Sequence, residues 1–379
     1  MGETNSFTGN VTSLRTTHQY LTSTDAFSKS IKFACFTKTP LLKVLGVEGF
    51  GAENMTNVDR FASAKAGGMI REMSGVYACA GSIFNSYPTS QLVGRMTAVN
   101  PQLVEGGTEW KYSWHQMVNS IFIPVNDVQD NGKGLIDIKI KNMMAMKQQY
   151  VTDLSNTLLG NSAAPSYGVM GPSVVYSDIP NLISVTQDRT VGCIPTASNT
   201  FWQNGRRAIT SIGGGGEMDR PLLLRRAWLK ALNDQMKLGE ASAPSDYLYV
   251  ATQGAWQYFD RMAYADAIET GKGDFGVSRR YDPVGVQAFA FNGGAVVWDP
   301  SISIPYGATA ATEAIYGIHK PSFFLSIRSE ENFKMTDWEQ PRAHDQFKTL
   351  ISTLSTRFTL GTDNRRAHYV LYNIPQNAD

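Results

Sequence analysis

The chain has 379 residues, of which 42% are hydrophobic and 18% are charged, so it can bury a core and holds about two globular units. Its net charge of +1 gives no electrostatic basis for tight binding of nucleic acid or of an anionic membrane. No apolar run suggests a transmembrane helix, and the first residues lack the pattern of a secretory signal. Three cysteines (Cys35, Cys79 and Cys193) are too few for a disulfide framework, which indicates synthesis in a reducing cytoplasm.

The first part of the chain predicts an arm followed by a ribbon. Residues 1–66 show no sustained hydrophobic period and predict an N-terminal arm. Residues 67–131 begin with a glycine pair and predict an extended two-stranded loop. In this loop Trp110, Tyr112 and Trp114 alternate with polar residues, which is the period of a strand with one apolar face.

The aromatic stripe predicts a contact between copies of the chain. A two-stranded hairpin is at best marginally stable alone, and a row of exposed rings is an apolar patch that needs cover. We therefore expect Trp110, Tyr112 and Trp114, with Arg95 in the same loop, to contact a neighbouring copy. Burial of the rings within their own chain is the alternative.

A long amphipathic helix is the central element of the sequence. Between Gly132 and Gly160 apolar residues recur near a 3.6-residue period, and lysines and glutamines lie between them. The apolar positions are Ile136, Ile140, Met143, Met144, Val151, Leu154 and Leu158. The pattern predicts about 25 helical residues, and Gly160 stands where a left-handed C-cap is expected.

The second half of the chain predicts a compact α/β lobe and then a β-rich end. Residues 161–216 form a Gly/Pro/Ser-rich crossing, and a helix is expected from Asp219 to Leu238 with Pro221 in its first turn. Strands at 247–252 and 290–302 and a helical segment at 254–268 complete a lobe over about 217–320. Further strands are expected at 322–328 and 332–338. A hairpin of 347–360 and 368–374 is expected to close the chain around residues 361–364.

The order of these parts resembles the tailed-phage major capsid proteins with the Hong Kong 97-like fold. The residues that carry the resemblance are Gly67-Gly68, Asn131-Gly132 before the helix, Phe201-Trp202-Gln203-Asn204, and the segments 244–258, 292–300, 332–341 and 356–374. The resemblance implies an α+β fold with an N-terminal arm (1–66), an extended β-ribbon loop (67–131), a spine helix, a peripheral domain (132–216 and 321–379) and an axial domain (217–320). Specificity lies in the order and spacing of the motifs.

The resemblance also implies a function and a set of partners. It implies a major capsid protein whose pentamers and hexamers form the icosahedral shell of a tailed double-stranded DNA phage. Such a shell is assembled in the host cytoplasm and forms the capsid of the virion. The implied partners are further copies of the chain, a portal protein, scaffold or decoration proteins, and packaged DNA bound without sequence preference, with no membrane. An encapsulin nanocompartment, which has the same fold, and a hydrolase or binding module are the alternatives.

The sequence carries no enzyme signature. Gly271–Gly276 matches the dinucleotide fingerprint in letters, but a predicted helix rather than a strand precedes it, so we interpret it as a loop. The five histidines lack the spacing of metal ligands, and no serine stands in a nucleophile elbow. We expect no catalytic residue, cofactor or metal.

Four arginine pairs are the remaining candidates for a site. Ion pairs within and between subunits are the interpretation favoured by the near-zero net charge, and contact with packaged DNA is the alternative. Arg225-Arg226 forms one pair. The pairs assigned to an inter-subunit or DNA-facing role are Arg206-Arg207, Arg279-Arg280 and Arg365-Arg366.

Overall fold

The computed structural model describes residues 31, 34–35, 41, 70–75, 77, 79–84, 107–130, 138–160, 178–209, 219–237, 246–257, 277–281, 287–291, 294–309, 312–339 and 349–375. Nearly all of the predicted arm, the tip of the predicted loop, with Arg95, and the Gly271–Gly276 loop lie outside these residues. Among the described residues, none of the helices combines the length and the apolar content that a membrane crossing requires.

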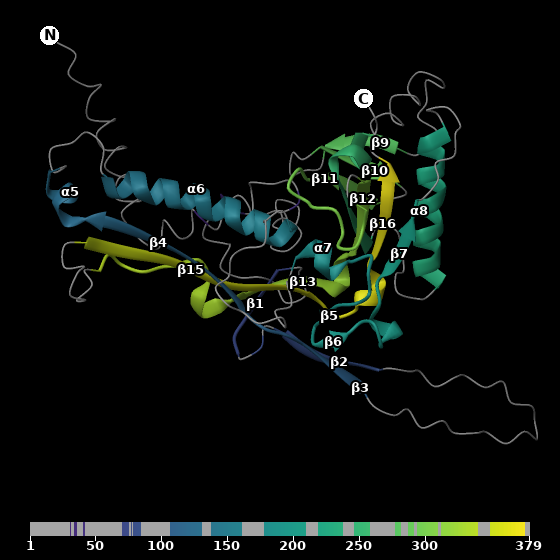
Figure 1. Cartoon of the computed structure of the whole chain (residues 1–379), viewed down its shortest axis with the longest axis horizontal. Helices are drawn as coiled ribbons and strands as arrows, with labels where there is room; N and C mark the ends of the chain where they lie inside the picture. Colours follow the sequence, from purple (N-terminus) through teal and green to yellow (C-terminus); the bar gives the residue numbers. More distant parts are fainter. Residues whose placement is uncertain are drawn as a thin grey trace, which may run out of the picture.

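Two sheets organise the described chain (Figure 1). The first has the strand order β1-β13-β15-β14, with β4 also paired to β15. Its strands are β1 (Ile70–Met73), β4 (His115–Pro124), β13 (Phe323–Arg328), β14 (Lys334–Met335) and β15 (Thr349–Thr362). Ten residues of β4 pair with β15 in antiparallel register, from His115 opposite Phe358 to Pro124 opposite Thr349. These two strands form a long limb of the molecule (Figure 1).

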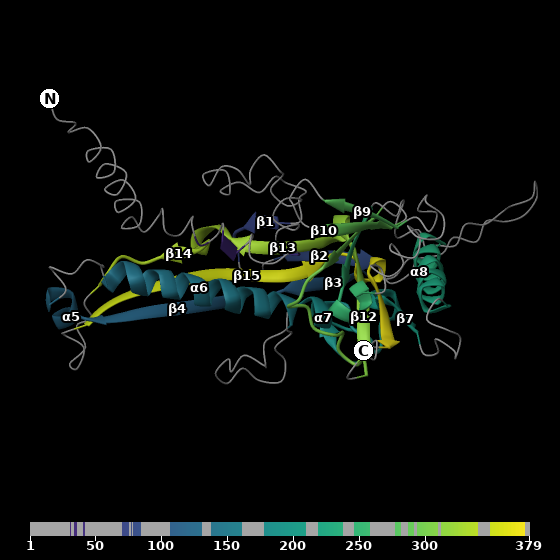
Figure 2. The same cartoon turned by 90° about the horizontal axis from the view of Figure 1, so that it is seen from above.

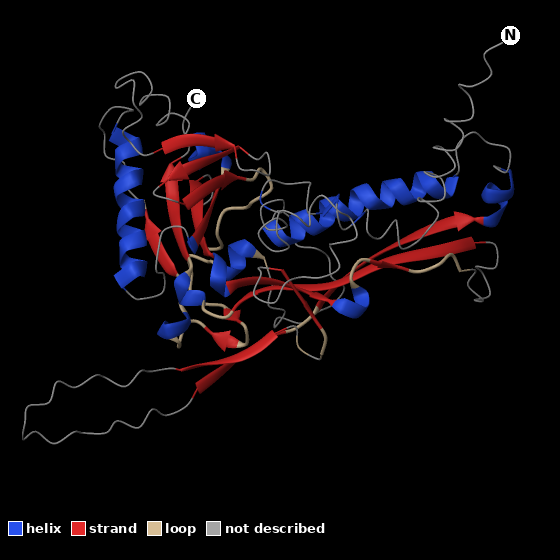
Figure 3. Ribbon diagram, turned by 180° about the vertical axis from the view of Figure 1, so that it is seen from behind, coloured by secondary structure: helices blue, strands red, loops and turns tan. Residues whose placement is uncertain are grey.

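The second sheet has seven strands in the order β7-β16-β12-β8-β11-β10-β9. Their bounds are β7 (Gly205–Ala208), β8 (Tyr247–Ala251), β9 (Val277–Tyr281), β10 (Gln287–Phe291), β11 (Gly294–Trp298), β12 (Thr312–His319) and β16 (Tyr369–Pro375). Every residue of β8 is buried. Helix α8 (Asp219–Lys237) stands against this sheet at the end of the molecule remote from α5 (Val125–Asp130), as Figure 3 shows from behind.

The predicted long helix is confirmed as α6 (Ile138–Leu159), which has 22 residues. It lies along β4 and β15, as Figures 1 and 2 show from two directions. Its buried positions are Met143, Met146, Tyr150, Val151, Leu154, Ser155, Leu158 and Leu159. Met144, which the sequence places on the apolar face, is exposed, because the buried stripe follows 143, 146, 150 and 154 instead.

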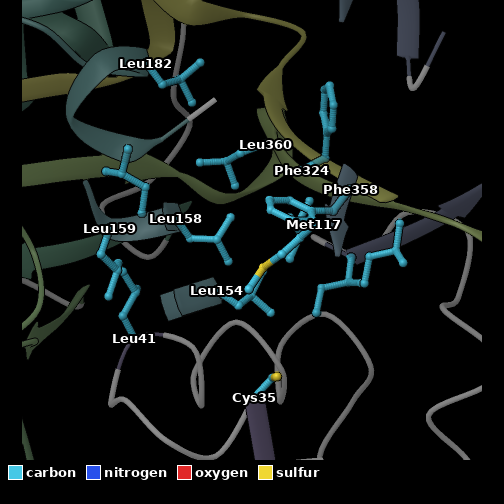
Figure 4. Packing of buried hydrophobic residues seen from close by; sticks show 14 of the residues in the cluster. Cys35, Leu41, Met117, Leu154, Leu158, Leu159, Leu182, Phe324, Phe358 and Leu360 are labelled. Atoms are coloured by element: carbon cyan, nitrogen blue, oxygen red, sulfur yellow. The ribbon is translucent and has the colours of Figure 1, made fainter. Parts of the chain in front are cut away.

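One large core cluster includes the space between α6 and the first sheet, and a second cluster packs α8 against the second sheet. Leu154, Leu158 and Leu159 of α6 meet Met117 of β4 and Phe358 and Leu360 of β15 in one cluster of buried side chains (Figure 4). Leu182 of the short helix α7 (Ile179–Leu182) and Phe324 of β13 belong to the same cluster. Burial of each such side chain contributes roughly 1.5–3 kcal/mol, so the helix is held mainly by this packing.

Gly160 ends α6 in the left-handed conformation, with φ of +73°, which confirms the predicted C-cap. A Cβ at this position would lie 2.8 Å from Cγ of Pro180 in α7. We expect Gly160→Ala to lower the free energy of unfolding by about 1–2 kcal/mol, because a left-handed backbone is costly for alanine. Urea unfolding followed by circular dichroism measures this loss. The exposed helix variant Gln148→Ala serves as the control, and equal stability of both variants would contradict the assignment.

The predicted extended loop is only partly a ribbon. β2 (Cys79–Phe84) and β3 (Gly107–Tyr112) pair in antiparallel register, with Gly81 opposite Trp110. However, β1 and β4, which lie in the same predicted segment, are members of the first sheet. Two short strands, β5 (Thr190–Val191) and β6 (Ile194–Pro195), pair beside the ribbon, and the backbone N–H of Lys111 donates to the carbonyl of Gly192 at 3.0 Å.

The predicted closing hairpin is wrong. β15 and β16 lie in different sheets, because the chain turns through a 3-10 segment, η7 (Arg365–Ala367), and crosses from one sheet to the other. β16 then pairs with β12 and β7. The second sheet therefore contains strands from both of the sequence ranges that were predicted to form the peripheral domain, β7 and β16, whereas the first sheet contains strands from the second of these ranges only.

Candidate assembly surface

The aromatic stripe of Trp110, Tyr112 and Trp114 was predicted to be exposed on its own chain. Two of these three side chains are buried within that chain. Trp110 and Tyr112 are 6% and 3% exposed, so the expectation that another copy must shelter them is wrong. Their ring centroids lie 6.1 and 5.7 Å from that of Phe324 in β13. The ring of Trp110 also lies over Gly81, where a Cβ would come within 2.5 Å of it. The alternative that we considered for the stripe, burial in the chain's own core, is the one observed for these two rings.

Hydrogen bonds fix Tyr112 where the ribbon enters the body. Its hydroxyl donates to the carbonyl of Thr362 at 3.1 Å and accepts from the backbone N–H of the same residue at 3.2 Å. Trp114 is half-buried, and its Nε1 donates to the carbonyl of Gly75 at 2.9 Å. The Tyr112 bonds anchor the base of the β2–β3 ribbon to the end of β15, and the Trp114 bond joins the start of β4 to the turn after β1.

Arg365, which was assigned to an inter-subunit or DNA-facing role, is instead fully buried. Its Nε donates to the carbonyl of Leu182 at 2.7 Å, and its Nη2 donates to Oγ of Ser184 at 2.9 Å. Its Nη1 donates to Oε1 of Gln187 at 2.9 Å and to the carbonyl of Trp202 at 3.1 Å. Burial lowers the pKa of this guanidinium to about 10, so it is charged at neutral pH.

The same network explains the motif at 201–204. Nδ2 of Asn204 donates to the carbonyl of Ser184 at 3.1 Å, and Nε2 of Gln187 donates to Oδ1 of Asn204 at 3.1 Å. Nε1 of Trp202 donates to the carbonyl of Val191 at 2.8 Å. The motif therefore ties the crossing at 178–205 to the turn that carries Arg365, and its role in this chain is structural.

The other predicted arginines differ in position. Arg206 is exposed in β7, and its Nη1 donates to the carbonyl of Val185 at 2.5 Å. Arg207 and Arg366 are half-buried. Arg279 and Arg280 lie in β9, opposite Phe289 and Ala288 of β10, and their side chains are not described. The structure does not bring the three pairs together into one basic face.

An apolar face that the sequence analysis missed lies on the outside of β4 and β15. Val118 and Phe122 of β4 are 52% and 58% exposed, whereas Met117, Ile121 and Ile123 on the opposite side of the strand are buried with α6. We call the exposed side the β4–β15 outer face. It comprises Gln116, Val118, Ser120 and Phe122 together with their partners Ile351, Thr353, Ser355 and Arg357.

Polar contacts lie on and beside the β4–β15 outer face. Oγ of Ser120 lies 3.2 Å from Oγ1 of Thr353, and Nε of Arg357 lies 2.8 Å from a carboxylate oxygen of Glu331. The signal that could have revealed this face is the two-residue period of Val118, Ser120 and Phe122. This period is not evident in the sequence, because Ile121, Phe122 and Ile123 form one continuous apolar run.

The described residues hold no chemistry that suggests catalysis. They contain no group of three or more His, Cys, Asp or Glu side chains placed to hold a metal ion. The buried histidines His319 and His368 are engaged in hydrogen bonds with the backbone and with hydroxyls. What the described surface offers is a long limb with two exposed apolar side chains, Val118 and Phe122, on its outer face.

Comparison with known proteins places the fold. No protein-family model matches the chain, and no curated protein matches it. Among solved structures, a chain of the Cyanophage A-1(L) capsid asymmetric unit superimposes with a TM-score of 0.50 at 12% identity, over 81% of this chain and 91% of that one. A chain of the capsid of a native GTA particle has a TM-score of 0.47 at 10% identity, over 83% and 90%. The chain therefore has the fold of a phage capsid protein.

Proposed function

We propose that this chain is the major capsid protein of a tailed double-stranded DNA phage and assembles through pentamers and hexamers into an icosahedral shell in the virion. The observation that carries the proposal is the shared fold with the cyanophage capsid chain, which covers 81% of this chain. The role is structural and requires no catalytic step. Portal, scaffold or decoration proteins and non-specifically bound DNA are the further partners in this proposal.

The proposal assigns separate tasks to the parts of the subunit. The limb of β4 and β15, covered by α6 on one side, supplies stiffness and presents Val118 and Phe122 on its outer face. Obligate interfaces typically bury about 2,000–5,000 Å² and have apolar centres, so a neighbouring copy is the occupant expected for Val118 and Phe122. The β2–β3 ribbon is anchored at its base by Tyr112 and extends away from the body (Figure 1).

Electron microscopy of the purified full-length chain tests the proposal. Closed shells of uniform size are the expected result, and particles from phage-producing cells should hold nuclease-protected DNA. Particles that enclose protein and no DNA would favour a nanocompartment. A chain that remains monomeric at every concentration tested would overturn both readings.

The outer face is tested by the double variant Val118→Thr, Phe122→Thr. We expect the subunit to keep its stability, because both side chains are exposed and threonine favours strands. The concentration needed for particles should rise at least about tenfold, since burying one phenylalanine contributes roughly 1.5–3 kcal/mol and 1.4 kcal/mol is tenfold. Light scattering against concentration measures this.

The matched control for this double variant is Met144→Thr, which removes an equally exposed apolar side chain from the outside of α6. We expect it to assemble like the wild type. Unchanged assembly of the Val118/Phe122 variant, or an equal defect in the control, would contradict the assignment of the outer face.

A further inference from the structure

Two short crossings between the two sheets meet at one place. The first crossing runs from β12 through the 3-10 segment η5 (Lys320–Ser322) into β13. The second runs from β15 through η7 into β16. The backbone N–H of Asp363 in the second crossing donates to the carbonyl of Ser322 in the first at 3.1 Å. The crossings are therefore in direct contact.

The imidazole of His368 joins the two crossings. Its Nδ1 accepts from the backbone N–H of His319 at 3.0 Å, at the end of β12. Its Nε2 lies 2.9 Å from Oγ1 of Thr362, at the end of β15, and 3.4 Å from Oγ of Ser322. The ring is completely buried. One side chain thus bridges the ends of strands from both sheets.

The hydrogen bonds define which nitrogen of His368 carries the proton. A backbone N–H can only donate, so Nδ1 must present its lone pair to His319. In the neutral ring the proton is then on Nε2, which donates to Oγ1 of Thr362. A second proton would have to occupy Nδ1 and would point at the N–H of His319. Protonation of Nδ1 therefore breaks the hydrogen bond between His368 and the backbone of His319.

The surroundings of His368 oppose a positive charge. Burial, with His319 of β12 and Arg365 of η7 nearby, holds the pKa of His368 well below its usual range. Two tyrosine hydroxyls also bond at the junction: Tyr247 of β8 donates to the carbonyl of Ala367 at 2.9 Å, and Tyr112 of β3 bonds Thr362. Lys320 of η5 and Arg366 of η7 are further charged side chains of the crossings. Asp363 contributes its backbone N–H to the contact.

We propose that protonation of His368 breaks the hydrogen bonds by which its imidazole joins the two crossings, so that the junction between the sheets opens in acid. The opened junction lets the imidazole reach water, where its pKa returns to about 6.5. Since the open form binds the proton more tightly, acid favours opening. From pH 7.5 to pH 5.0 the opening constant should increase by up to about thirtyfold, for a ring that titrates at about 6.5 when open and well below that when closed. The device is a property of the single chain and does not depend on shell assembly.

Hydrogen exchange measured by mass spectrometry on the full-length, unassembled chain tests the proposal. After correction for intrinsic exchange rates, peptides covering 315–327 and 359–371 should lose about thirtyfold protection between pH 7.5 and 5.0. Peptides of α6 should change little. In the His368→Gln variant the protection of the crossings should be the same at pH 7.5 and pH 5.0, even if it is lower than in the wild type. In His115→Gln, which removes a histidine of β4, the acid-dependent loss should persist.

Two results would overturn the proposal. One is a wild-type chain whose crossings lose no more protection in acid than α6 does. The other is a His368→Gln chain that keeps the acid-dependent loss. If that variant does not fold, the wild type labelled with ¹³C at its histidines supplies the answer by nuclear magnetic resonance. One of the five histidine resonances should report a neutral ring until the pH at which protection is lost. If all five resonances titrate near pH 6.5, the proposal is refuted.

Discussion

Replacing Arg365 with methionine is expected to destabilise the subunit by at least about 4 kcal/mol. The change leaves four buried acceptors without their donor: the carbonyls of Leu182 and Trp202, Oε1 of Gln187 and Oγ of Ser184. Each buried acceptor left unpaired costs about 1–3 kcal/mol. Domains have only about 5–15 kcal/mol of stability in total, so the variant is expected to be largely insoluble or unfolded.

Urea unfolding monitored by tryptophan fluorescence, together with the soluble fraction after expression, measures the effect of Arg365→Met. The control is Arg226→Met, which makes the same chemical change on the exposed side of α8. It should shift the free energy of unfolding by less than about 0.5 kcal/mol, as is usual for surface sites. An Arg365→Met chain within about 1 kcal/mol of the wild type would show that the guanidinium network is not needed for the fold.

The second large effect is expected for Trp110→Ala, which should lower the free energy of unfolding by about 3–5 kcal/mol, as for other buried tryptophans. The indole fills the space between Gly81, Tyr112 and Phe324, and the substitution leaves a cavity there. Any loss of assembly in this variant then follows from loss of the fold. The exposed-ring variant Phe122→Ala should change stability by less than about 1 kcal/mol.

The comparison of Trp110→Ala with Phe122→Ala separates a core residue from a contact residue. Calorimetry on the unassembled chain reports stability, and light scattering reports assembly. A Trp110→Ala chain of normal stability that fails to assemble would restore the interpretation of this ring as a contact between copies. It would contradict the burial of Trp110 seen in the structure.

Elements defined by local patterns could be predicted from the sequence. The period of apolar residues and Gly160 identified α6, which is described from Ile138 to Leu159. The apolar run at 247–252 identified β8, and the glycine pair at 293–294 separated β10 from β11. In each case the signal lies within the segment itself, in its spacing or its turn residues.

Features that depend on distant partners could not be predicted in the same way. The pairing of β4 with β15 joins residues more than 200 positions apart. The burial of Trp110 depends on Phe324, and the separation of β15 from β16 depends on the bonds of Arg365 to residues 182–202. An aromatic stripe has the same spacing whether its own chain or another one covers it. The fault in the prediction was the assumption that the ribbon had no body to lie against.

The mass of the purified full-length chain in solution tests the central claim most directly. Sedimentation velocity over a range of concentrations distinguishes the 41.7 kDa subunit from large closed particles. We expect a population of discrete particles of many subunits above a threshold concentration. This threshold should be higher for the Val118→Thr, Phe122→Thr variant. A single 41.7 kDa species at all concentrations, with or without the proposed scaffold partner, would contradict this expectation.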